Sequence, residues 1–228
     1  MVKTGVALLM VLAASRATAQ ETGRIEGVAS IANRLVGSRL RVRVYEDAGT
    51  PPPRPDSADS RFANVVLYLE STTPIRGHAV PVRPVMMQSG ERFVPHVLPV
   101  LVGTTVEFPN DDPIYHNVFS LSRVRSFDLG RYPRGSSKSV LFSSPGVVQV
   151  FCHIHADMNG YILVLDNPFF VVPDPQGHFV IEGIPPGEYR LVAWHERIHP
   201  MVTPIRVEAG HTLNLELRIP LADTGSVR

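Results

Sequence analysis

The residues that could do chemistry are concentrated in one short segment, Phe151-Cys-His-Ile-His-Ala-Asp-Met158. It contains the only cysteine of the chain, Cys152. A thiolate, an imidazole and a thioether, here spaced C-x₂-H-x₂-M, are the ligands of copper in electron-transfer sites. The segment joins two apolar β runs, so its side chains should lie on one tight turn at the rim of a sheet. The sequence therefore predicts a copper site with Cys152, His155 and Met158 among its ligands.

Such a set needs a second imidazole, which should come from a neighbouring strand. His116 begins an apolar β run after the turn Pro109-Asn-Asp-Asp-Pro113, and its His-Asn-Val context makes it the favoured residue. His96 is also near a strand and remains the alternative. Taken alone, Cys152 would be read as a buried inert thiol and Met158 as core filler. Their spacing, between two strands, favours metal binding instead.

The elements around this segment are short and regularly spaced. The chain holds 21 prolines and 17 glycines, and no helical period longer than a turn is visible. This pattern predicts an all-β fold, an antiparallel sandwich or barrel. The expected strands are Arg24–Ile31, Arg39–Tyr45, Ala63–Glu70, Phe93–Val100, Thr104–Phe108, His116–Ser120, Lys138–Phe142, Gly146–Cys152, Tyr161–Leu165, Gly177–Ile184, Glu188–Trp194, Pro204–Ala209 and Thr212–Ile219.

Residues of about 95–166 resemble the cupredoxins, the plastocyanin, amicyanin and pseudoazurin group. Two stretches carry the resemblance: Val106-Glu-Phe-Pro-Asn110 with the following His116-Asn-Val118, and Pro145–Val164. The resemblance implies a Greek-key β-sandwich with one mononuclear type 1 (blue) copper, bound by His116, Cys152 and His155 and axially by Met158. It also implies that Asn117 orients the ligand loop by hydrogen bonding and that Phe151 lies next to the ligands without binding copper.

The residues that flank Cys152 bear on catalysis. Multicopper oxidases carry His-Cys-His, and copper nitrite reductases need His immediately before Cys, whereas this chain has Phe151 there. We therefore expect His153 to point away from the metal, into solvent or a domain contact, and we expect no enzyme activity. The run His195-Glu-Arg-Ile-His199 matches the H-E-x-x-H zinc-protease pattern, but it follows a β run and ends at Pro200, so it is interpreted as a chance match.

The ends of the chain suggest export and a second domain. Residues 1–19 have a basic start, a short apolar run and an Ala17-Thr-Ala19 cleavage site, as in a secretory signal peptide, and the run is too short for a membrane span. We divide the rest into a cupredoxin domain (20–166), a small β-sandwich-like domain (167–222) and a tail (223–228). The second domain resembles carboxypeptidase-regulatory or transthyretin-like domains through Gly177-x-Phe and Ile184-Pro-Pro-Gly-Glu-Tyr-Arg-Leu191.

The net charge and the expected export limit the classes of function that fit this chain. Removing residues 1–19 takes away Lys3 and Arg16 and no acid, which leaves 20 basic and 21 acidic residues. This near-neutral balance gives no case for nucleic-acid binding. We expect a periplasmic or secreted protein without a membrane span after cleavage. It would carry single electrons to or from a transient partner, a c-type cytochrome or an exported dehydrogenase. The alternative is a periplasmic copper-binding or copper-handling protein without an electron-transfer role.

Overall fold

A computed structural model describes residues 21–31, 62, 64–71 and 83–220. The predicted signal peptide, the strand expected at 39–45 and the 223–228 tail lie outside these residues. The described residues form sixteen β-strands and no helix, which confirms the all-β prediction. Within them, nothing helical has the length and apolar character of a membrane span.

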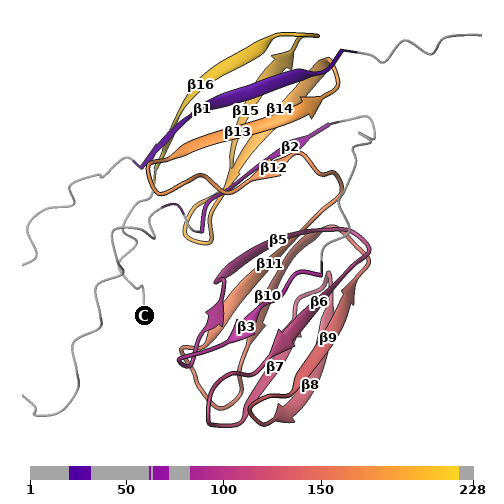
Figure 1. Cartoon of the computed structure of the whole chain (residues 1–228), viewed down its shortest axis with the longest axis vertical. Coiled ribbons are helices and arrows are strands. Elements are labelled where there is room, and N and C mark those ends of the chain that lie inside the picture. Colours follow the sequence, from indigo (N-terminus) through magenta and orange to yellow (C-terminus); the bar gives the residue numbers. More distant parts are fainter. Residues whose placement is uncertain (1–20, 32–61, 63, 72–82, 221–228) are drawn as a thin grey trace, which may run out of the picture.

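The strands form two sandwiches, one above the other in Figure 1. The lower sandwich has a five-stranded sheet, ordered β5-β11-β10-β7-β8, with the pairs β6-β9 and β3-β4. Its strands are β3 (Met87–Gln88), β4 (Phe93–Val94), β5 (Val97–Leu101), β6 (Thr104–Pro109), β7 (His116–Leu121), β8 (Ser126–Tyr132), β9 (Ser137–Phe142), β10 (Gly146–Phe151) and β11 (Asn159–Leu165).

The upper sandwich packs a three-stranded sheet, ordered β13-β1-β16, against a four-stranded sheet, ordered β12-β2-β14-β15. Its strands are β1 (Gly23–Ile31), β2 (Val66–Glu70), β12 (Phe170–Val171), β13 (His178–Ile184), β14 (Gly187–Trp194), β15 (Met201–Val207) and β16 (Thr212–Ile219).

The core of the lower sandwich follows from alternation along its strands. In β10, Val148 and Val150 are fully buried, and in β6 Val106 and Phe108 are fully buried. Side chains of the five-stranded sheet and of the β6-β9 pair meet in one apolar cluster. Successive residues of a strand point to opposite faces, so this alternation leaves the other face of the five-stranded sheet outside the core.

The pairing of β1 and β2 corrects the sequence-based domain division. Both strands fall within the predicted 20–166 domain, but β1 pairs with β13 and β16, and β2 pairs with β12 and β14. Alternating apolar residues predict a half-buried strand without naming its partner strand, which explains the difference. Ile25, Leu67 and Leu69 are buried in the core of the upper sandwich. They enlarge a unit that, as residues 167–222 alone, would be small for an independent core.

The two sandwiches meet through a small apolar cluster centred on Trp194. Val66 and Trp194 of the upper sandwich pack with Val97 and Leu163 of the lower one. The Trp194 ring also lies edge-on to Tyr161, with ring centroids 5.6 Å apart. The upper sandwich therefore covers the outer face of the five-stranded sheet on its β5-β11 side.

Removing the Trp194 side chain should weaken this contact strongly. Trp194 is 7 % exposed, so Trp194→Ala leaves a cavity, and we expect it to lower the free energy of unfolding by about 3 kcal/mol. Urea unfolding followed by circular dichroism measures this loss. Val202→Ala is the control, because Val202 is 40 % exposed and its loss should cost less than about 0.5 kcal/mol. Equal losses for both variants would contradict the assignment of Trp194 to the contact.

Candidate metal centre

The segment that contains Cys152 forms a tight connection between two adjacent antiparallel strands. β10 ends at Phe151, which is paired with Asn159, the first residue of β11. Two backbone hydrogen bonds close the loop: the Met158 N–H donates to the His155 carbonyl (3.0 Å), and the Cys152 N–H donates to the Met158 carbonyl (3.1 Å). These two bonds tie the loop back onto itself between β10 and β11.

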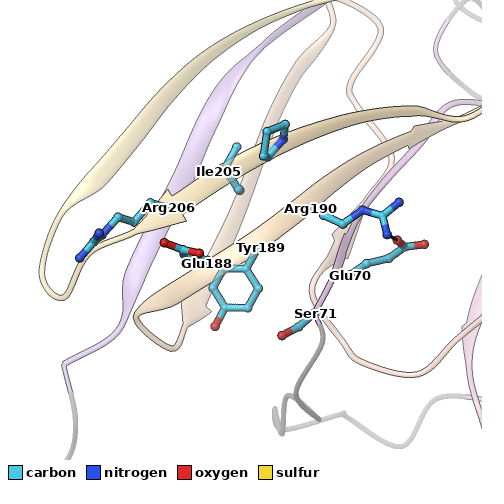
Figure 2. Close-up of a pocket in the computed structure, with 8 residues that line it drawn as sticks. Glu70, Ser71, Glu188, Tyr189, Arg190, Ile205 and Arg206 are labelled. Atoms are coloured by element: carbon cyan, nitrogen blue, oxygen red, sulfur yellow. Dashed lines mark ion pairs between the residues drawn. The ribbon is translucent and has the colours of Figure 1, made fainter.

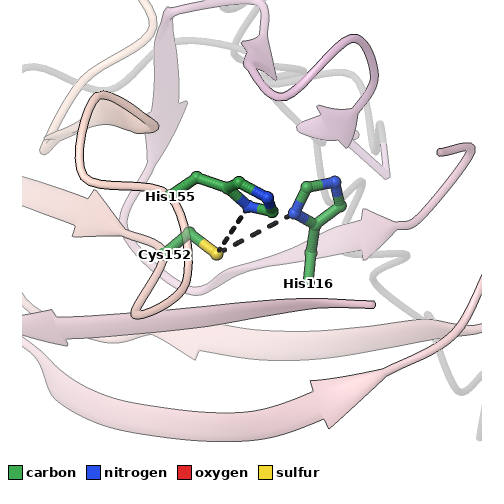
Figure 3. Close-up of side chains that lie close together, drawn as sticks. All are labelled: His116, Cys152 and His155. Atoms are coloured by element: carbon green, nitrogen blue, oxygen red, sulfur yellow. Dashed lines mark hydrogen bonds between the residues drawn. The ribbon is translucent and has the colours of Figure 1, made fainter. Parts of the chain in front are cut away.

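Three side chains converge at this end of the lower sandwich (Figure 3). The Cys152 Sγ lies 3.8 Å from Nδ1 of His116 and 3.7 Å from Nδ1 of His155. The three donor atoms all lie within 4.8 Å of one another. A thiol placed between two imidazole nitrogens is a donor set that can hold a soft transition-metal ion, so the residues present fit copper.

Burial differs among the four predicted ligands. His116 is fully buried, Cys152 is 5 % exposed and Met158 is 1 % exposed. Cys152 and Met158 belong to the same core cluster. The His155 side chain is 21 % exposed and is the part of the group that reaches the surface. Among the four residues, His155 is therefore the most accessible to solvent.

Asp112 fixes the orientation of His116. Its Oδ2 lies 2.7 Å from Nε2 of His116, on the side of the ring away from Cys152. The backbone N–H groups of Gly90 and Glu91 donate to the same carboxylate, at 2.6 and 2.9 Å. Burial raises the pKa of Asp112, but these backbone hydrogen bonds and the one from His116 outweigh it and hold the pKa below its ordinary value.

An ionised carboxylate only accepts hydrogen bonds. Nε2 of His116 therefore carries a ring proton. In the neutral imidazole this leaves the lone pair on Nδ1, on the side of Cys152, as metal-binding histidines require. Asp112 was not among the site residues predicted from the sequence. Its position four residues before His116, within the Pro109–Pro113 turn, was the available signal.

Asn117 ties the ligand loop to the neighbouring strands, the role the cupredoxin resemblance implies. Its Oδ1 accepts a hydrogen bond from the His153 N–H at 3.1 Å, and its Nδ2 donates to Oδ1 of Asp128 at 2.6 Å. The backbone next to Cys152 is therefore anchored to β7 and β8.

The alternative histidine, His96, lies elsewhere. Its Nε2 is 3.7 Å from Oε1 of Glu196, and its ring meets Tyr161 edge-on at the contact between the sandwiches. It is not a member of the His116, Cys152 and His155 group. The structure therefore places His116, and not His96, beside Cys152 and His155.

His153 and Phe151 face away from the ligand cluster. The His153 ring is stacked on Phe119, with centroids 3.8 Å apart and an interplanar angle of 4°, and its side chain is 52 % exposed. Phe151 lies beside the same phenylalanine, at a centroid distance of 5.7 Å. His153 thus points toward solvent, one of the two directions predicted for it, and does not lie in the domain contact.

The H-E-x-x-H run is not on a helix. It follows β14 as a turn in which the Ile198 N–H donates to the His195 carbonyl. Burial lowers the pKa of His195, whose Nδ1 accepts a hydrogen bond from the Arg197 N–H at 3.1 Å, while His199 is exposed. The arrangement lacks the two imidazoles on one helix face that the zinc-protease pattern requires.

A separate cavity of about 510 Å³ lies in the upper sandwich, where it is lined by residues of β2, β14 and β15 and by Ser71 (Figure 2). Its walls carry charges of both signs, including an ion pair in which Arg190 Nη1 lies 3.5 Å from Glu70 Oε2. Tyr189, also in the lining, donates its hydroxyl proton to the Pro185 carbonyl. None of the predicted copper ligands lines this cavity, and we assign it no role in metal binding.

Comparison with known proteins gives structural similarities and no sequence relatives. No protein-family model matches the chain, and no curated protein matches it. Among solved structures, the chain is similar to a Cu-containing nitrite reductase from Thermus scotoductus SA-01, with 28% identity and a TM-score of 0.36. That similarity covers 41% of this chain and 25% of the nitrite reductase, so this chain spans about a quarter of its length.

Two smaller copper proteins are similar over nearly their full length. A purple cupredoxin from Nitrosopumilus maritimus is 24% identical, with a TM-score of 0.33, over 36% of this chain and 96% of its own. A reduced mutant of amicyanin is 21% identical, with a TM-score of 0.35, over 43% of this chain and 98% of its own.

Proposed function

We propose that this chain binds one copper ion through His116, Cys152 and His155, with Met158 as a fourth and weaker ligand, and carries single electrons. One observation supports this most strongly: the thiol lies between two imidazole nitrogens, with all three donor atoms within 4.8 Å of one another. Bound copper would supply reversible one-electron chemistry.

Residues around the site hold the predicted ligands in positions that suit electron transfer. Asp112 holds His116 in the tautomer that leaves Nδ1 available, and the closed backbone loop holds Cys152 and His155. A site whose ligands are held in place changes little between the two charge states, which favours fast electron transfer. With four protein ligands, no position remains for a substrate, which supports a carrier and not an enzyme.

Export and partners are part of the same proposal. The signal-peptide pattern of residues 1–19 supports a periplasmic or secreted protein. A transient contact with a c-type cytochrome or an exported dehydrogenase would then exchange the electron, and redox contacts of this kind are small. The His155 imidazole, the part of the ligand group that reaches the surface, supports this surface as one exit for the electron.

A redox cycle distinguishes the carrier from a copper-handling protein. We expect protein loaded with one equivalent of Cu(II) to show strong copper–thiolate absorption that bleaches with one electron per chain and returns on reoxidation. A Cu(I) chelator added to the reduced protein should remove little copper over many cycles. Colourless Cu(I) that passes readily to the chelator, with no reversible cycle, would support copper handling and overturn the carrier role.

A further inference from the structure

Three aromatic rings form a cluster next to the predicted copper ligand Cys152. They belong to Phe119, Phe151 and His153, which we call the ring platform. His153 is bonded to Cys152 through one peptide group and stacks on Phe119 at a centroid distance of 3.8 Å. Phe151 precedes Cys152 and is paired with Phe119 across the sheet. The two residues on either side of the cysteine therefore both join the platform.

The platform lies on the outer face of the five-stranded sheet. Val118 and Val150 are fully buried in the core, so their neighbours Phe119 and Phe151 point to the opposite face. Leu121, 78 % exposed, and Val147, 40 % exposed, add apolar surface on the same two strands. An apolar surface of this kind needs an explanation when it is not covered.

The upper sandwich covers only one side of that face. Its Trp194 and Val66 pack on Val97 and Leu163, which belong to β5 and β11. In the strand order β5-β11-β10-β7-β8, the platform lies on β10 and β7, beyond this contact. Figure 1 shows β8, the edge strand next to the platform, on the part of the lower sandwich that lies away from the upper one.

Exposed arginines lie in and next to β8, the edge strand beside the platform. Residues 121–138 contain five basic residues and one acid, Asp128. All five are exposed: Arg123, Arg125, Arg131 and Arg134 lie in or next to β8, whereas Lys138 lies on β9 of the other sheet. Arg134 pairs with Asp111, but the first three arginines make no ion pair with any described residue. The one acid, Asp128, accepts hydrogen bonds from Asn117 and from the Gly130 N–H, and its Oδ2 lies 3.8 Å from Nε2 of His153, so it faces the platform itself while the three unpaired arginines surround it.

We infer that the ring platform is the docking face for a redox protein with an acidic surface, which exchanges its electron with the copper site through His153 and Cys152. This inference rests on the proposed function. One electron leaves the reduced partner, which is oxidised, and reduces Cu(II) to Cu(I). No bond forms or breaks. Arginines around the platform attract an acidic partner and raise its association rate, while the apolar rings make the close contact.

Stopped-flow reduction of the Cu(II)-loaded chain by hexacyanoferrate(II), an anionic one-electron donor, tests the charge. The variant Arg125→Glu/Arg131→Glu should lower the second-order rate constant about tenfold at low ionic strength. The matched control Arg206→Glu/Arg218→Glu makes the same change of net charge on exposed residues of the upper sandwich and should lower it less than about twofold. At 1 M salt, where screening acts over about 3 Å, the two variants should converge.

The variants His153→Ala and Phe119→Leu test whether the electron passes through the ring platform. Each should slow reduction by hexacyanoferrate(II) severalfold while the copper–thiolate absorption stays that of the unmodified chain. Equal effects of the two arginine pairs, or unchanged rates in both ring variants, would overturn the docking face. Failure of the proposed function differs from this: the unmodified chain would then show no copper–thiolate absorption and take up no electron from the donor.

Discussion

Replacing Cys152 with serine is expected to abolish the visible copper–thiolate absorption of the Cu(II)-loaded chain. The sulfur is the soft anionic donor of the set, and a serine hydroxyl at the same buried position does not ionise to replace it. Removing a group that only hydrogen-bonds to a metal ligand costs about 10- to 100-fold in metal affinity. Removing the ligand Cys152 itself should cost more. Absorption spectra during a Cu(II) titration, with a competing chelator to give the affinity, measure both effects.

The matched control is His96→Asn. His96 was the alternative ligand in the sequence, and the structure places its ring at the contact with Tyr161 and Glu196. We expect this variant to keep the absorption and affinity of the unmodified chain. An absorption band that survives in Cys152→Ser, or that disappears in His96→Asn, would show that the ligand set is different.

The second large effect is expected from Asp112→Asn. The carboxylate accepts hydrogen bonds from His116 and from the backbone of Gly90 and Glu91, and an amide cannot accept all three as an anion does. We expect copper affinity to fall about 10- to 100-fold. The metal-free protein should lose about 1–3 kcal/mol of unfolding free energy, because the buried His116 imidazole loses a charged acceptor.

The neighbouring residue provides the control. Asp111 is 58 % exposed and pairs with Arg134 at 3.3 Å, so Asp111→Asn removes the same charge one position away without touching His116. Its effect on stability should stay below about 0.5 kcal/mol, with little change in copper affinity. If both variants weakened copper binding equally, the effect would be one of overall charge and not of the hydrogen bond to His116.

The ligand loop was predictable because its chemistry is contiguous. Cys152, His155 and Met158 lie in one turn between two β runs, so their spacing alone brings them to the same end of the sheet. His116 needed the resemblance to a family or the fold, because its approach to Cys152 depends on how β7 lies beside β10. Asp112 depends on the three-dimensional path of a turn, which spacing does not give.

The part of the fold that was hardest to predict from the sequence is which strands pair with each other. β1 and β2 have recognisable apolar alternation, but alternation does not say which sheet receives a strand, so both were assigned to the first domain. β8 was missed because Asp128, Gly130 and Arg131 interrupt its pattern, although Phe127 and Leu129 still pack against the core. The resemblance of the C-terminal strands to transthyretin-like domains stays a prediction.

X-ray absorption at the copper edge of the chain loaded with one equivalent of copper tests the central claim most directly. The donor atoms of His116, Cys152 and His155 predict one strong sulfur scatterer and two imidazole groups around each copper, with the sulfur signal absent in Cys152→Ser. Copper surrounded by nitrogen and oxygen alone, or a spectrum that Cys152→Ser leaves unchanged, would contradict it.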